Sequence, residues 1–77
     1  MRKDQPLVMW TIYDSPKDFP GQFVARRFDI FAGNAVATAE VRTAPTIEML
    51  RRDFRKMGLF QQPRHAGDDP VIVEVWF

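Results

Sequence analysis

The feature that most constrains this chain is an almost wholly apolar run, PVIVEVWF, over residues 70–77. Its residues divide by parity into an apolar set, Val71, Val73, Val75 and Phe77, and a set with one carboxylate, Ile72, Glu74 and Trp76. This pattern predicts a β-strand with one apolar face and a second face that is mostly apolar. Because such a strand would promote aggregation at an open sheet edge, we expect it to lie inside a sheet or to pair across a partner.

Composition limits the class of protein. Seventy-seven residues suffice for one domain, and the absence of cysteine removes both disulfides and thiolate metal ligands. A chain without cysteine is typical of a reducing, intracellular setting. No apolar signal-peptide segment follows the basic residues near Met1, and no stretch approaches membrane-spanning length. We therefore expect a cytoplasmic protein that does not interact with a membrane.

Three segments rich in strand-forming residues precede one amphipathic helix. Strands are expected over residues 7–13, 22–31 and 35–41, with a proline-rich loop over 14–21 and a turn over 32–34. The helix is expected to begin within residues 43–46 and to stop at Gly58. Its apolar face is expected to hold Ile47, Leu50, Phe54 and Met57. A polar loop over 61–69 leads to the final strand.

The second strand has an imperfect alternation at Arg26 and Arg27. A straight strand places one of the two arginines on the core face, whichever register is chosen. A bulge at these two residues would place Phe23, Ala25 and the apolar residues after the bulge on one face and turn both arginines away. We favour the bulge over a straight strand with a paired, half-buried Arg26.

These elements predict a single α+β domain over residues 1–77. A small, largely antiparallel sheet of four strands would carry one helix on one face, in the order strand, strand, strand, helix, strand. We expect the helix to cover a face formed by Val8, Trp10, Ile12, Val71, Val73 and Val75. The opposite face would then hold Met9, Thr11, Tyr13, Ile72, Glu74 and Trp76.

Three segments resemble a family of small uncharacterised bacterial proteins. They are WTIYDSPKDFP over residues 10–20, FVARRF over 23–28 and DDPVIVEVW over 68–76. The resemblance spans nearly the whole chain, although residues 31–65 match less distinctly. It implies a bacterial, cytosolic, single-domain protein, and it implies no chemistry because the family has no established activity.

Catalytic and metal-binding motifs are weak. A nucleophilic triad would need Ser15, His65 and an aspartate such as Asp14 or Asp68, but Ser15 precedes a proline as in an ordinary turn. His65 with Asp68 and Asp69, or Asp14 with Asp18 in the other long loop, matches no defined metal spacing. No glycine-rich phosphate loop is present. We therefore expect no enzymatic activity, no cofactor and no metal.

Protein association is the function that the sequence favours. The sheet face away from the helix would expose a patch of apolar and aromatic residues, and such patches tend to mark interfaces. We expect the interface, with a second copy or an unidentified protein, to hold Met9, Tyr13, Arg26, Arg27, Ile72, Glu74 and Trp76.

Nucleic-acid binding is the alternative. A basic surface could form from Arg51, Arg52, Arg55 and Lys56 on the helix, with an aromatic side chain available for base stacking. However, eleven basic residues against ten acidic ones give a net charge of only +1. Because neutralisation of phosphates is the main source of affinity, we consider this alternative the weaker one. Convergence of the arginines on one face would favour it.

Overall fold

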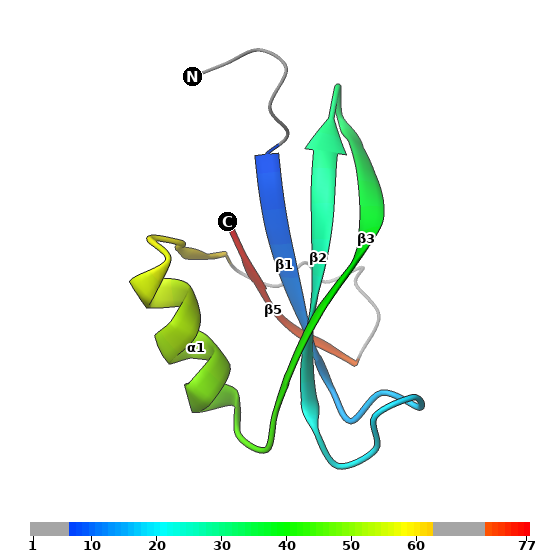
Figure 1. The fold of residues 1–77 in the computed structure, drawn as a ribbon, viewed down its shortest axis with the longest axis vertical. Helices are drawn as coiled ribbons and strands as arrows, with labels where there is room; N and C mark the ends of the chain where they lie inside the picture. The colour runs from blue at the N-terminus through cyan, green and yellow to red at the C-terminus, as the bar shows by residue number, and fades with distance from the viewer. Residues whose placement is uncertain (1–6, 63–70) are drawn as a thin grey trace.

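The computed structural model describes residues 7–62 and 71–77 and forms an α+β fold of one sheet and one helix (Figure 1). Its elements in chain order are β1 (Leu7–Asp14), β2 (Phe23–Phe31), β3 (Asn34–Ala44), α1 (Ile47–Lys56), β4 (Gln61–Gln62) and β5 (Ile72–Trp76). The predicted fold class is confirmed, but the sheet has five strands instead of four. The additional strand, β4, is too short and too polar to stand out in the sequence.

The five strands are antiparallel and lie in the order β3-β2-β1-β5-β4. The C-terminal strand β5 therefore lies inside the sheet, between β1 and the short β4, as the sequence predicted. Trp10 of β1 lies opposite Trp76 of β5. This pairing joins the first and last strands of the described chain. The strand order leaves β3 at one edge of the sheet.

The helix ends as predicted at Gly58 but begins later than predicted, because Thr43 and Ala44 belong to β3 and Pro45 precedes the N-cap. Thr46 is its N-cap residue, and the φ of Gly58 is +82°, a left-handed conformation that favours glycine. The N–H of Leu59 donates to the Phe54 carbonyl at 3.0 Å, and the N–H of Gly58 donates to the Arg55 carbonyl at 3.0 Å. These two bonds form a Schellman motif, which satisfies carbonyls at the end of α1 and turns Leu59 back towards the core.

The core lies between α1 and one face of the sheet. The Phe54 ring lies between two indoles, with ring centroids 5.3 Å from Trp10 and 5.7 Å from Trp76. The other buried members are Ile12, Ala25, Ala44 and Leu50. The predicted helix face is confirmed for Leu50 and Phe54, which are buried, and for Ile47, which packs against the core. Met57 is exposed because the helix ends one residue before it.

Residues 74–76 of β5 face opposite to the prediction, whereas Ile72, which pairs with Tyr13 beyond a register shift, stays on the predicted side away from the helix. Trp76 lies opposite Trp10, and Glu74 lies opposite Ile12, so both point towards the helix. Val75 lies opposite Thr11, on the face away from the helix, which we call the far face. The sequence pattern was misleading because Glu74 is buried with a cationic partner on α1, so an acidic residue occupies the core face.

The predicted bulge also lies elsewhere. The pairing of β1 with β2 runs without a break from Leu7–Ile30 to Asp14–Phe23, so β2 is straight. The pairing of β2 with β3 shifts register, and the extra residues are in β3, where residues 38–40 lie opposite Arg27 alone. Arg27 therefore shares the helix side with Ala25, and Arg26 lies on the far face. Each arginine has a carboxylate partner, which lets a straight strand carry both.

A two-residue turn joins β2 to β3. Phe31 lies opposite Asn34, and both intervening residues have positive φ, +49° at Ala32 and +84° at Gly33. This is the geometry of a type I′ turn, whose twist matches that of the flanking strands. The resulting hairpin extends well past the level of α1 (Figure 1). Its outer part is therefore not covered by the helix.

Candidate protein interface

The predicted interface residues do not share one face. Trp76 and Glu74 are only 2% and 4% exposed, and both lie beneath α1. Met9 and Tyr13 are half-buried on the far face of β1, where Tyr13 lies opposite Ile72. The apolar patch expected around Trp76 is therefore covered within the chain by its own helix.

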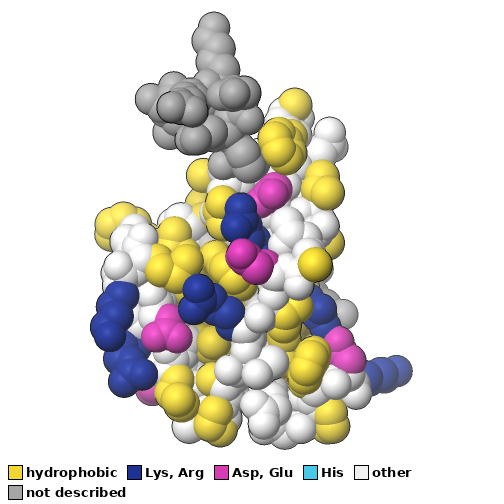
Figure 2. Space-filling model, viewed as in Figure 1, with side chains coloured by type: hydrophobic (Ala, Val, Ile, Leu, Met, Phe, Trp, Pro, Cys, Tyr) yellow, Lys and Arg dark blue, Asp and Glu magenta, His cyan; other side chains and the backbone are white. Residues whose placement is uncertain are grey.

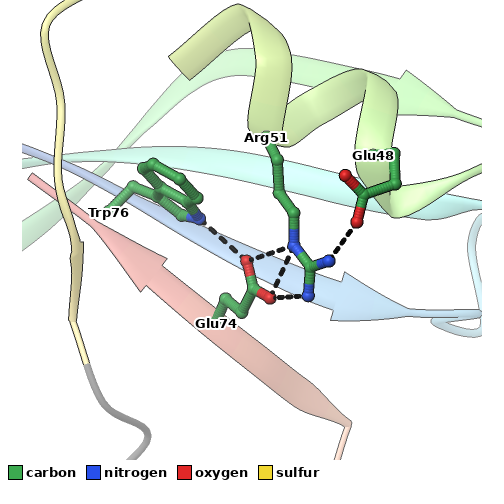
Figure 3. Close-up of polar contacts among 4 residues, drawn as sticks. All are labelled: Glu48, Arg51, Glu74 and Trp76. Atoms are coloured by element: carbon green, nitrogen blue, oxygen red, sulfur yellow. Dashed lines mark hydrogen bonds and ion pairs between the residues drawn. The ribbon is translucent and has the colours of Figure 1, made fainter. Parts of the chain in front are cut away.

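A polar network joins the buried carboxylate to the helix (Figure 3). Arg51 Nε donates to Glu74 Oε1 and Oε2 at 3.2 Å and 2.9 Å, and Arg51 Nη2 also contacts Oε2. Trp76 Nε1 donates to Glu74 Oε1 at 3.0 Å, and Arg51 Nη1 reaches Glu48 one turn back along α1. The hydrogen bonds to Glu74 raise the pKa of the Arg51 guanidinium above its ordinary value, against the opposing effect of burial. The network thus locks α1 onto β5.

The two arginines of β2 take part in separate ion pairs. Arg26 pairs with Asp18 in the loop before β2, and its guanidinium carbon lies 5.9 Å from the centre of the Tyr13 ring. Arg27 contacts Asp29 and Glu40, in both cases at 3.1 Å. The hydrogen bond to Glu40, followed by that to Asp29, raises the pKa of Arg27. The two side chains lie on opposite faces of the sheet and do not form one surface.

The basic residues of α1 also have different environments. Arg51 is held by the buried Glu74, and the guanidinium of Arg55 lies 5.8 Å from the centre of the Trp76 ring. Arg52 and Lys56 are exposed. On the face shown in Figure 2, acidic side chains lie beside basic ones over the sheet, while a group of basic side chains lies along the helix side. Among the described residues, the arginines do not converge on one face.

A groove lies at the C-terminal end of the helix. It has a volume of about 380 Å³ and is lined by Arg55, Gly58, Leu59, Phe60, Gln61 and Trp76. Phe60 is strongly exposed beside it. The groove combines the Arg55 cation and the Gln61 amide with aromatic surface.

The weak catalytic and metal candidates are only partly within the described residues. The Ser15 hydroxyl accepts a hydrogen bond from the Gly21 N–H at 2.8 Å and so closes its loop. His65, Asp68 and Asp69 lie outside the described residues. In residues 7–62 and 71–77, no group of three or more histidines or carboxylates is placed to hold a metal ion. The same ranges contain no helix of the length and hydropathy needed to cross a membrane.

The edge strand β3 is the most exposed element of the sheet. Nine of its eleven residues are exposed, with only Thr38 half-buried and Ala44 buried. The strand holds neither lysine nor proline, two residues that commonly protect sheet edges, and its protection is limited to two charged residues and the irregular stretch at residues 38–40. The sequence predicted the strand but not its exposure. A usable signal was the alternation of small alanines at residues 35, 37 and 39, which gives that side of the strand little apolar area to bury.

The outward-pointing backbone groups of β3 can be worked out strand by strand, starting from two hydrogen bonds at the end of β1. Asp14 N–H donates to the carbonyl of Val71, beside β5, and Ser15 N–H donates to the carbonyl of Gln22, beside β2. Backbone groups of successive strand residues point to opposite edges. Even-numbered positions of β1 therefore face β5, and odd-numbered positions face β2.

The same alternation continues across β2. Thr11 pairs with Arg26, so the backbone N–H and C=O of Arg26 point towards β1. Those of the adjacent Ala25 therefore point the other way, towards its partner Arg42 on β3. Arg42 consequently faces inward, and the N–H and C=O of its neighbours Val41 and Thr43 face outward. Within the described ranges no other strand lies beyond β3, and nine of its eleven residues are exposed.

Comparisons with known proteins found no matching family model, no matching curated protein and no matching solved structure. The resemblance to small bacterial proteins therefore remains a prediction, and the functional argument depends on the geometry of the chain.

Proposed function

We propose that this chain is a non-enzymatic protein-interaction domain that binds a strand of another polypeptide along the open edge of β3. The exposure of β3 along nearly its whole length is the observation that carries this proposal. Main-chain hydrogen bonds supply the affinity in such strand addition, and side chains at alternate positions supply the specificity. This surface replaces the Trp76 face that the sequence suggested.

The rest of the described structure supports a role in presenting this edge. The polar network of Arg51, Glu74 and Trp76 fastens the helix to the sheet, and the aromatic cluster fills the space between them. Both contribute to a rigid sheet, and a rigid edge loses little conformational entropy when a strand is added. Most of the described arginines have carboxylate or aromatic neighbours, and they lie on several faces, so nucleic-acid binding has less support.

Replacing Val41 by proline tests the proposal because it removes an outward N–H while leaving the inward hydrogen bonds of β3 in place. The probe is a displayed library of random linear peptides, selected against the wild-type chain. We expect selected peptides to lose about tenfold or more of their affinity for Val41→Pro, since at least one main-chain hydrogen bond is lost. Val41→Thr is the matched control, because it keeps the N–H and the β-branched shape, and it should bind as the wild type does.

A second variant guards against a local folding defect. Thr43→Pro removes the other outward N–H and should weaken binding to the same extent, while circular dichroism should report a folded chain for each variant. The proposal is wrong if no peptide is enriched, or if enriched peptides bind Val41→Pro and Thr43→Pro as tightly as they bind the wild type.

A further inference from the structure

We propose that the strand bound at this edge is β3 of a second copy of the chain, antiparallel and related by a twofold axis at Val41. This inference rests on the proposed function and names its partner. Two identical strands that pair antiparallel form a closed, self-complementary contact, in which each residue contacts its counterpart across the axis. A dimer of this kind covers both open β3 edges with one contact.

The charges of β3 are complementary to themselves in this register. The only charged residues of the strand, Glu40 and Arg42, lie on either side of Val41. With the axis at Val41, Glu40 of each copy lies opposite Arg42 of the other, so two ion pairs form. Both side chains lie on the helix side of the sheet and are 57% and 45% exposed. They can therefore reach a second copy.

Neighbouring registers are disfavoured. Moving the axis to Glu40 would place the two Glu40 carboxylates opposite each other, and moving it to Arg42 would oppose the two guanidinium groups. Like charges directly opposite across a strand pair are destabilising. The order Glu-Val-Arg therefore selects the register centred on Val41 over both adjacent ones, which specifies a contact between copies.

Backbone geometry agrees with this register. Because the N–H and C=O of Val41 face outward, two copies centred there can exchange a pair of hydrogen bonds across the axis. A twofold axis perpendicular to the sheet also keeps the two helix sides together, so Glu40 and Arg42 meet on the same face. Val41, which is 36% exposed, would contact its counterpart. The two sheets would then continue as one.

Charge exchange between two single variants tests this inference. Glu40→Arg leaves two cations on the strand, and Arg42→Glu leaves two carboxylates, so each variant should repel its own copy. Replacing two attractive contacts by two repulsive ones should weaken self-association by about tenfold or more. An equimolar mixture should restore the wild-type mass in light scattering, and so should the double variant Glu40→Arg with Arg42→Glu. Circular dichroism confirms that each variant is folded, since Glu40 also pairs with Arg27, and Arg42 also contacts Asp53 and Trp10.

The outcomes separate this inference from the proposed function. Self-association that is unchanged in both single variants, or is not restored on mixing, would overturn the register. A wild-type chain that stays monomeric while selected peptides still depend on Val41 would overturn self-pairing and leave strand binding intact. If peptides also bind independently of Val41 and Thr43, both proposals are wrong.

Discussion

Replacing Phe54 by alanine is expected to lower the free energy of unfolding by about 3–5 kcal/mol. Phe54 is fully buried and its ring lies between Trp10 and Trp76, so the substitution leaves a cavity between two large indoles that cannot close it without moving the sheet or the helix. Domains of this size are stable by only about 4–12 kcal/mol, so a large part of the total would be lost. Urea unfolding followed by tryptophan fluorescence measures the change.

Met49 provides the control on the same helix. It is 42% exposed and outside the aromatic cluster, so Met49→Ala should change the stability by about 0.5 kcal/mol or less. Equal losses for Phe54→Ala and Met49→Ala would contradict the packing of α1 on Trp10 and Trp76.

Replacing Arg51 by methionine is expected to destabilise the chain by about 2–3 kcal/mol, because Glu74 would then be buried without its cationic partner. The loss should be smaller than for a fully enclosed pair, since the Arg51 side chain is 27% exposed. Adding Glu74→Gln to this variant should recover part of the stability. A glutamine still accepts the Trp76 N–H but carries no charge that needs neutralising.

A double-mutant cycle in urea unfolding measures this coupling. Arg52→Met is the matched control, because Arg52 is the exposed neighbour of Arg51 on the same helix, and it should change the stability by about 0.5 kcal/mol or less. Losses for Arg51→Met and Glu74→Gln that simply add would mean that the two side chains do not stabilise one another.

Local patterns were sufficient to predict the helix and four of the five strands. The helix was predictable because Leu50 and Phe54 keep helical spacing and Gly58 supplies a left-handed residue where the helix stops. The interior position of β5 followed from its apolar residues on both faces. Short β4 was missed because two glutamines carry no pattern of their own, and their pairing depends on where β5 lies.

The orientation of β5 could not be predicted from alternation alone. Three valines suggested one core face, whereas the buried residues of β5 are Glu74 and Trp76. The decisive partner, Arg51, lies 23 residues away in the sequence, on the helix. A rule that places charges outside fails when a guanidinium from another element pairs with a buried carboxylate, and only the tertiary structure shows that pairing.

The candidate interface was hidden for a similar reason. Residues 35–41 were correctly predicted as a strand. Whether a strand is central or at an edge depends on strand order, and no local pattern shows that β5 pairs with β1 and leaves β3 at the edge. The pairing of β2 with β3 was needed to show that the backbone N–H and C=O of Val41 point outward, and only then could Glu40 and Arg42 be considered as contacts to a second strand. Exposure is a property of the assembled sheet.

Amide hydrogen exchange at Val41 and Thr43 tests strand binding at the β3 edge most directly. The wild-type chain would be measured from dilute to concentrated solution and with a selected peptide. We expect both amides to exchange fast in dilute solution and to become protected when a second copy or the peptide binds, while the inward Arg42 amide is protected throughout. Association that leaves the exchange of Val41 and Thr43 unchanged would contradict the account.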